Sequence, residues 1–366
     1  MRKVAKTVAA VGAVALLAAG CASKSNDSSS SNNTSSSSTS SASTGSKIKA
    51  CMVLDTGGVD DKSFNQSSWA GLQAAAKANP NIDPHYVPSN SQDDYTPNLT
   101  AETNAGCDTT IAVGGLMGDN VKAIAAANPT KHYAEIDAPS SGANVYGLEF
   151  NTAQGGFLGG YLAAALSKTG KVGTWGGLNI PPVTIYMDGF WEGVQYYNKQ
   201  KSKNVAVLGW DEMNQKGGTF AQSFTDSNKG KQLSQAMIQQ GADIIFPVAG
   251  GAGGGALAAA AASGGKANVI WVDTDGVESN PDSAQYIITS VTKGLSQSVQ
   301  DYMKQVGTGT YPTGNYVGTL QNGGTGLAPY HDWDSKVPAD VKSDLETITK
   351  GIEDGSIKIS SPSQPK

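Results

Sequence analysis

Residues 48–55 read IKACMVLD, a short apolar run that ends in a carboxylate. A glycine-containing turn follows, and Ser63 then stands where it can cap an amphipathic segment that carries Trp69 and Leu72. A strand, a turn and a capped helix in this order form the repeating unit of a parallel sheet covered by helices. The stretch therefore predicts an α/β fold whose first strand begins at Ile48.

The same alternation continues along the chain and restarts once. The roughly 320 residues after the N-terminal region exceed what one hydrophobic core usually serves, so we expect two doubly wound parallel-sheet lobes. The predicted strands are 48–55, 85–88, 109–115, 132–137 and 145–150 in the first lobe, and 171–177, 205–210, 243–250, 269–273 and 286–292 in the second.

Two late strand-like segments, 287–291 and 316–320, come after the second sheet is largely complete. We therefore expect the chain to cross between the lobes more than once and to form a hinge. Such a hinge places a ligand in the cleft at the carboxyl ends of both sheets. The expected lobes are 48–152 with about 290–316, and 153–289 with about 317–366.

The N-terminus has the pattern of an export signal. Three basic residues precede an apolar stretch over 8–19, and small residues lead to Cys21. The pattern resembles a bacterial lipoprotein signal, which implies a signal peptide over 1–20, acylation of Cys21 and a location on the outer face of the cell membrane. An ordinary secreted protein with an incidental cysteine is the alternative. Residues 22–47 are nearly all Ser, Asn or Thr, a composition that predicts a flexible tether.

The charge of the mature chain argues against nucleic acid and against an anionic ligand. Removal of residues 1–20 takes three of the 26 Lys and Arg and none of the 31 Asp and Glu, leaving a net charge of about −8. Arg2 is the only arginine, so the mature chain lacks the side chain that most often reads carboxylates and phosphates. These features favour an uncharged ligand.

Two cysteines remain in the folded region, Cys51 and Cys107. They are too few for a structural zinc site and suit one disulfide in an oxidising compartment. Cys51 starts the first strand and Cys107 precedes the third, and these strands are neighbours in a sheet of order 2-1-3. Two buried free thiols are the alternative with equal weight.

Polar residues recur at the predicted strand ends, where the ligand of an open α/β sheet binds. An ionised aspartate only accepts hydrogen bonds, so several facing one cleft suit a ligand with many hydroxyl groups. A helix cap is the favoured explanation for any single strand-end aspartate, but carboxylates at three equivalent strand ends favour a ligand. The strand-end candidates are Asp55, Asp137, Asp273, Asp275 and Lys293, together with the glycine pairs 114–115, 176–177 and 250–251.

Catalytic interpretations find little support. Residues 251–256 fit G-x-G-x-x-A, with Asp273 about twenty residues on, but this dinucleotide pattern comes late in the chain. The local physics still suits a ligand, because the glycines allow close backbone approach and the acid can accept from ribose hydroxyls; a glycine turn needed only for close helix packing is the alternative. The three histidines stand at strand starts or in the tail, and no metalloprotease, nucleophile-elbow or Walker pattern occurs. Asp60 and Asp61 suit the dipole at a helix start better than a metal. We expect no enzyme, no cofactor and no metal.

Residues 53–66, VLDTGGVDDKSFNQ, resemble the opening motif of the basic membrane protein family, the PnrA-like solute-binding lipoproteins of ABC transporters. The resemblance continues across almost the whole folded region. Further matching segments are YAEID at 133–137, GGFLGG at 155–160, KVGTWGG at 171–177, GF at 189–190, SFTD at 223–226, VAGG at 248–251, VDTD at 272–275 and SVTK at 290–293.

This resemblance implies a type I periplasmic-binding-protein fold that holds a purine nucleoside. The base would stack between Phe64 and Phe224, with Phe220 or Trp210 as alternatives for the second ring. Asn65 and Asp137 would bind the base edge. The sugar would meet Asp55, Lys293 and either Asp273 or Asp275, and Gly250 or Gly251 would add a backbone contact.

The resemblance further implies a monomer that delivers its ligand to an ABC permease and ATPase and that touches the membrane only through its lipid anchor. Another flat heterocycle such as riboflavin is the alternative within this class. A nucleoside hydrolase or an NAD-dependent dehydrogenase represents the enzyme class. A surface antigen, for which the long tether is the only support, is the third.

Overall fold

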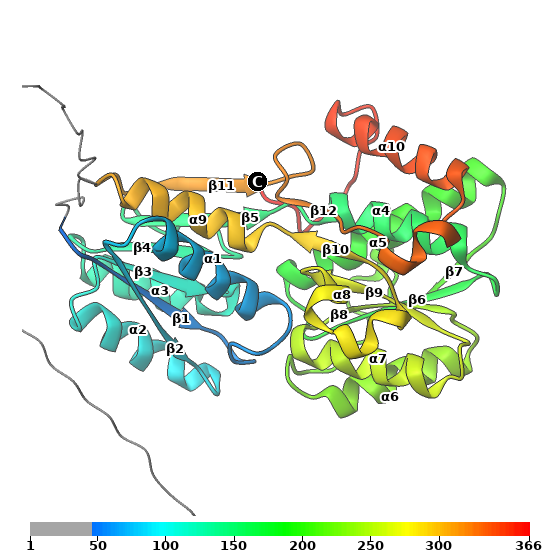
Figure 1. Cartoon of the computed structure of the whole chain (residues 1–366), viewed down its shortest axis with the longest axis horizontal. Helices are drawn as coiled ribbons and strands as arrows, with labels where there is room; N and C mark the ends of the chain where they lie inside the picture. Colours follow the sequence, from blue (N-terminus) through cyan, green and yellow to red (C-terminus); the bar gives the residue numbers. More distant parts are fainter. Residues whose placement is uncertain (1–45) are drawn as a thin grey trace, which may run out of the picture. The chain divides into compact units, whose positions relative to one another are not determined.

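The computed structural model describes residues 46–366. The predicted signal peptide, Cys21 and nearly all of the Ser-rich tether lie outside the described residues. Two compact lobes, each built on one six-stranded sheet, make up the described part (Figure 1). This arrangement confirms the predicted α/β fold with two doubly wound parallel-sheet lobes.

The first sheet has the order β11-β5-β4-β3-β1-β2, and every neighbouring pair is parallel. Its helices are α1 (Phe64–Ala78), α2 (Tyr95–Asn104), α3 (Gly118–Ala127) and α9 (Leu295–Val306). The strands are β1 (Ile48–Leu54), β2 (Ile82–Pro88), β3 (Thr109–Val113), β4 (His132–Ile136), β5 (Val145–Phe150) and β11 (Gly314–Gly318).

The second sheet has the order β12-β10-β9-β8-β6-β7. Only β12 is antiparallel to its neighbour, β10. Its strands are β6 (Lys171–Gly176), β7 (Ala206–Leu208), β8 (Ile244–Val248), β9 (Asn268–Asp273), β10 (Ile287–Lys293) and β12 (Thr325–Leu327). The helices of this lobe are α4 (Ala153–Leu166), α5 (Pro181–Lys201), α6 (Ser227–Gln239), α7 (Gly254–Ala262), α8 (Gly276–Ser279) and α10 (Ala339–Glu353).

The two sheets repeat one strand order, in which each strand of the first has a counterpart at the same place in the second, although β12 is antiparallel where its counterpart β11 is parallel. In this correspondence β4 matches β9. Asp137 directly follows β4 and Asp273 ends β9, and both have a positive φ of 68°. A left-handed backbone is uncommon for a non-glycine residue, so the same unusual conformation turns a carboxylate away from each strand.

The chain passes between the lobes three times among the described residues: from β5 to α4, from β10 to α9 and from β11 to β12. Helix α9 packs on α1, and its Val299 and Met303 belong to the core of the first lobe. The crossing after β10 comes at Gly294, because β10 belongs to the second sheet along its whole length. The expected boundary near residue 290 therefore falls inside a strand of the second lobe.

The GGFLGG segment lies in α4, where it packs against α5. A side chain at Gly160 would place its Cβ 2.0 Å from the carbonyl oxygen of Phe190, and one at Gly189 would place it 2.1 Å from that of Ala153. These glycines let the two helices approach closely, so this motif builds the core that supports the site.

A disulfide joins Cys51 and Cys107, whose Cα atoms are 5.9 Å apart. It ties β1 to the connection two residues before the neighbouring strand β3. Of the two interpretations that the sequence left open, the structure shows the bridge.

Candidate ligand-binding site

A cavity lies between the carboxyl ends of the two sheets, which is where the ligand of an open α/β sheet binds. Both lobes contribute to its walls. The first lobe supplies Asp55, Thr56, Asp61, Phe64, Gly114, Gly115, Leu116 and Asp137; the second supplies Ile180, Pro182, Val183, Tyr186, Phe224, Val248, Ala249, Gly250, Asp273 and Lys293.

Most residues predicted from strand ends or from the family resemblance line this cavity, but Asn65, Gly176, Gly177, Gly251 and Asp275 do not. Asn65 is buried behind Asp55 and donates to its carboxylate at 2.9 Å. Gly251 stands one residue beyond the lining Gly250. Asp275 accepts from Val277 N at 3.0 Å as the cap of α8, because two further residues turn it away from the end of β9. Of the two alternatives for the sugar, only Asp273 reaches the cavity.

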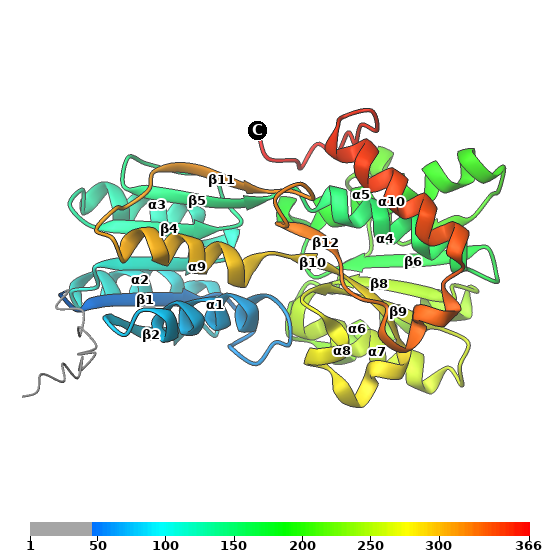
Figure 2. The same cartoon turned by 45° about the horizontal axis from the view of Figure 1, so that its top comes forward.

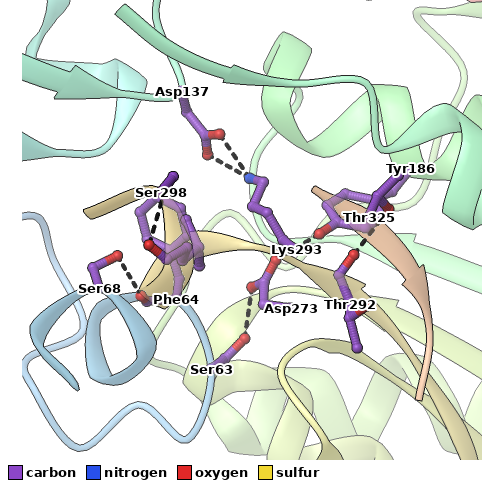
Figure 3. Close-up of polar contacts among 11 residues, drawn as sticks. Ser63, Phe64, Ser68, Asp137, Tyr186, Asp273, Thr292, Lys293, Ser298 and Thr325 are labelled. Carbon is purple, nitrogen blue, oxygen red and sulfur yellow. Dashed lines mark hydrogen bonds and ion pairs between the residues drawn. The ribbon is translucent and has the colours of Figure 1, made fainter. Parts of the chain in front are cut away.

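A buried ion pair crosses between the lobes. Lys293, the last residue of β10, donates from Nζ to both carboxylate oxygens of Asp137 at 2.7 Å (Figure 3). Burial raises the pKa of Asp137, and the ammonium of Lys293 opposes that rise. Because two charges removed from water need a complete set of partners, this pair depends on both members being present.

A second polar link crosses between the lobes at Asp273. Its Oδ2 accepts from Ser63 Oγ at 2.6 Å, and its Oδ1 accepts from Tyr186 Oη at 2.7 Å (Figure 3). The predicted cap at Ser63 is therefore wrong: Ser63 precedes α1, but its hydroxyl is drawn across to Asp273. The two strand-end aspartates that match in topology thus each bind the opposite lobe.

Asp61 takes over the role predicted for Ser63. Its carboxylate accepts from the backbone N–H groups of Ser63, Asn65 and Gln66 at 2.8 to 3.1 Å, which satisfies the free donors at the start of α1. Burial raises the pKa of Asp61 to about 6, against the lowering effect of these hydrogen bonds. Asp61, which with Asp60 was predicted to complement the dipole at a helix start, thus lies at the start of α1 and caps it.

Asp55 lies at the base of the cavity, directly after β1. Burial raises its pKa well above the ordinary value for aspartate, and the hydrogen bond from Asn65 opposes the rise. The carboxylate rests against Gly114, where an added Cβ would be 2.5 Å from Oδ2 and where φ is 123°. The glycine at this strand end is therefore required by both space and backbone conformation.

Two phenylalanine rings line the cavity from opposite lobes. Phe64 begins α1, and the Lys293 ammonium lies 5.0 Å from the centroid of its ring. Phe224 lies against Gly177, where a Cβ would be 2.3 Å from the ring. Neither Phe220 nor Trp210 lines the cavity, so Phe224 is the one of these three candidate rings that does.

The sequence interpretation missed Tyr186 and the apolar wall formed by Ile180, Pro182 and Val183. All four lie at or near the start of α5, one connection beyond the end of β6. No strand-end signal points to them. The two prolines at the start of α5, Pro181 and Pro182, were the available clue, because proline in the first turn marks a helix beginning near a strand end.

Two α/β lobes, three crossings between them and a cavity at their facing strand ends define a two-lobed solute-binding protein. The family model of the PnrA-like ABC transporter substrate-binding proteins, Bmp, matches residues 48–357. The chain belongs to this family, and its role is that of a substrate-binding protein of an ABC transporter rather than an enzyme.

Individual relatives agree with this placement. The chain is 30% identical to the CD4+ T-cell-stimulating antigen of Listeria monocytogenes, over 86% of this chain and 88% of the relative. It is 28% identical to the ABC transporter nucleoside-binding protein BmpA of Lactococcus lactis, over 86% and 89%. A crystal structure of an ABC transporter solute-binding protein from Aeropyrum pernix is similar, with a TM-score of 0.78, 26% identity, and coverage of 86% and 94%.

None of the helices between residues 46 and 366 combines the length and the hydropathy that a bilayer span requires.

Proposed function

We propose that this chain captures a nucleoside, with purine nucleosides preferred, and delivers it to the permease and ATPase of an ABC importer. The observation that carries the proposal is the cavity itself, which combines an aromatic ring from each lobe with carboxylates from each lobe. Aromatic faces suit a flat neutral base, and carboxylates suit the hydroxyl groups of a sugar. The name of the Lactococcus lactis relative supports the same ligand class.

In this proposal the base stacks on Phe64 and Phe224, and the sugar lies where Lys293 borders the Phe64 ring. Asp273 accepts from sugar hydroxyls, since each of its oxygens keeps a free lone pair beside the hydrogen bond that it already accepts. Asp55 contributes from the base of the cavity, with Asn65 orienting it from behind. Asp137 holds the ammonium of Lys293.

The charge of the cavity favours a nucleoside over a nucleotide. Four aspartates line it, and Lys293 is the only basic residue among the described residues that do so. Its ammonium is already paired with Asp137. A phosphate group would therefore meet uncompensated negative charge, which is costly at a buried site.

Isothermal titration with inosine, adenosine, guanosine, uridine, riboflavin, hypoxanthine, ribose and inosine monophosphate tests this assignment. We expect saturable binding of the purine nucleosides, weaker binding of hypoxanthine, and none of the monophosphate. Binding of ribose without any nucleoside would overturn the proposal. Binding of riboflavin in preference to all nucleosides would show that the ligand is a flat heterocycle other than a nucleoside.

Phe64→Ala is expected to weaken nucleoside binding by about 1 to 3 kcal/mol, by analogy with the loss of an aromatic platform beneath a nucleic-acid base. Phe64→Leu is the matched control, because leucine keeps apolar bulk and removes only the flat face. Titration of inosine into both variants separates the two contributions. Equal affinity of the leucine variant and the unmodified protein would show that Phe64 packs against the ligand without stacking.

We further propose that Cys21 carries the lipid anchor, that residues 22–47 tether the lobes to the outer face of the cell membrane, and that the protein acts as a monomer. The sequence pattern before Cys21 supports the anchor. Detergent partitioning of the full-length protein beside its Cys21→Ser variant tests the anchor. A variant that still enters the detergent phase would refute it.

A further inference from the structure

The last residues of the chain run along one face of α5. Thr184, Asp188 and Glu192 are spaced by four residues and so form a single stripe on this helix. Ser360 N donates to Glu192 Oε1 at 2.8 Å, Ser361 Oγ donates to Asp188 Oδ2 at 2.6 Å, and Ser363 Oγ shares a hydrogen bond of 2.8 Å with Thr184 Oγ1. We call residues 360–364 the C-terminal strap.

The strap ends at a crossing between the lobes. Gln364 Nε2 donates to Asn151 Oδ1 at 3.2 Å, and Asn151 lies in the connection from β5 to α4. In both views the C-terminus lies near the junction of the two lobes (Figures 1 and 2). The match to the family model ends at residue 357, before the strap begins.

Asp188 connects the strap to a second part of the lobe. Its side chain is fully buried, and its Oδ1 accepts from Trp210 Nε1 and from Gln215 Nε2, both at 2.9 Å. Ser361 supplies the only hydrogen bond given to Oδ2 by the described residues. A buried carboxylate oxygen that loses its partner incurs a large desolvation cost. The hydrogen bond from Ser361 therefore stabilises the buried position of the Asp188 side chain.

The segment held by Asp188 leads to the ligand cavity. The Trp210 ring packs edge-on against Phe220 with centroids 5.9 Å apart, and Phe220 bridges to Gly176 at the end of β6. Four residues later, Phe224 lines the cavity. Residues 210–224 therefore carry one aromatic wall of the site on a segment that has little regular structure of its own.

We propose that the C-terminal strap and Asp188 position residues 210–224, and through them the Phe224 ring, for ligand binding. The contribution to affinity rests on the proposed nucleoside function, whereas the ordering of residues 210–224 does not. Without the Ser361 hydroxyl, Asp188 must rotate toward solvent or another donor. Either movement weakens the hydrogen bonds that Asp188 accepts from Trp210 and Gln215, and it thereby displaces the Phe224 ring.

Ser361→Ala tests the strap, with Ser360→Ala as the matched control. The Ser360 side chain only adds a longer contact of 3.3 Å to Glu192, which the Ser360 backbone N–H already binds. In ligand-free protein, we expect Ser361→Ala to speed hydrogen exchange in residues 210–224 at least severalfold and Ser360→Ala to leave it unchanged. Unchanged exchange in Ser361→Ala, or equal acceleration in both variants, would overturn the proposal.

Titration then connects the strap to the ligand. We expect Ser361→Ala to raise the Kd for inosine roughly fivefold to tenfold. In a Phe224→Leu background the same change should have less than a twofold effect, because no ring remains to be positioned. Equal effects in both backgrounds would show that the strap acts on general stability and would refute the positioning role.

A chain that stops after Ile359 provides an independent test, since it removes the whole strap and keeps Ile357 and Ile359 packed against the core. It should reproduce the exchange and affinity changes of Ser361→Ala, and affinity equal to that of the full chain would contradict the proposal. If the unmodified protein binds no nucleoside, the proposed function fails, while the ligand-free exchange experiment still decides the role of the strap.

Discussion

Replacing Lys293 with methionine is expected to lower the free energy of unfolding by about 3 to 5 kcal/mol and to weaken nucleoside binding by roughly 100-fold. Lys293 is 5% exposed, and it is the partner of both carboxylate oxygens of Asp137. The variant would leave Asp137 buried and without its partner at the edge of the cavity. Urea unfolding measures the stability, and titration with inosine measures the affinity.

A comparison with an exposed ion pair isolates the effect of burial. Lys342 binds Asp334 at 2.6 Å on the surface, where the aspartate side chain is 67% exposed. Lys342→Met should cost less than about 1 kcal/mol, because water replaces the lost partner. Adding Asp137→Asn to Lys293→Met should recover most of the stability and little of the affinity. A loss no greater than that of Lys342→Met would show that the pair between the lobes does not stabilise this state.

Glu135→Gln is expected to make the protein more stable at pH 9 by about 3 to 5 kcal/mol and to flatten its stability between pH 5 and 8. Glu135 lies in β4 with no solvent exposure, and neither carboxylate oxygen has a hydrogen-bond partner among the described residues. Burial, helped by the nearby charge of Asp119, raises its pKa from 4.5 to about 8.

The direction of this change in stability with pH follows from the number of protons that the folded and unfolded states bind. Between pH 4.5 and about 8 the folded protein keeps the proton on Glu135, whereas the unfolded chain releases it. The folded state therefore binds more protons in this range, and stability falls as the pH rises through it. Glutamine retains the shape without a charge. Urea unfolding at pH 5, 7 and 9 measures the effect, and Glu346→Gln, at an exposed position of α10, should leave the profile unchanged. A profile of Glu135→Gln parallel to that of the unmodified protein would contradict the assignment.

The strand ends could be predicted from the sequence, because each buried strand is an apolar run that stops at a polar residue or a glycine. Leu54, Val113 and Ile136 each end a buried run, and the polar or glycine residue that follows reaches the cavity. The same logic could not choose between Asp273 and Asp275. They differ by two residues, and only the left-handed turn at Asp273, with the cap formed at Asp275, separates their directions.

The contacts between the lobes could not be predicted from local sequence patterns. Ser63 has the local features of a helix cap, yet its hydroxyl binds Asp273, which lies 210 residues away in the chain. Tyr186 is one of several aromatic residues in α5, and nothing in its neighbourhood distinguishes it from those that only fill the core. Such roles depend on how the lobes meet, which local patterns do not record.

The path of the chain also sets an order for folding. Helix α9 supplies Leu295, Val299 and Met303 to the core of the first lobe, and β11 supplies its edge strand, yet both follow nearly the whole second sheet in sequence. During synthesis the first lobe keeps apolar surface uncovered until the ribosome has made residue 318 of the 366. Neither lobe corresponds to one uninterrupted stretch of the chain. A cut near residue 152 should therefore yield two insoluble fragments. A circular permutant keeps every segment in one chain and should still fold.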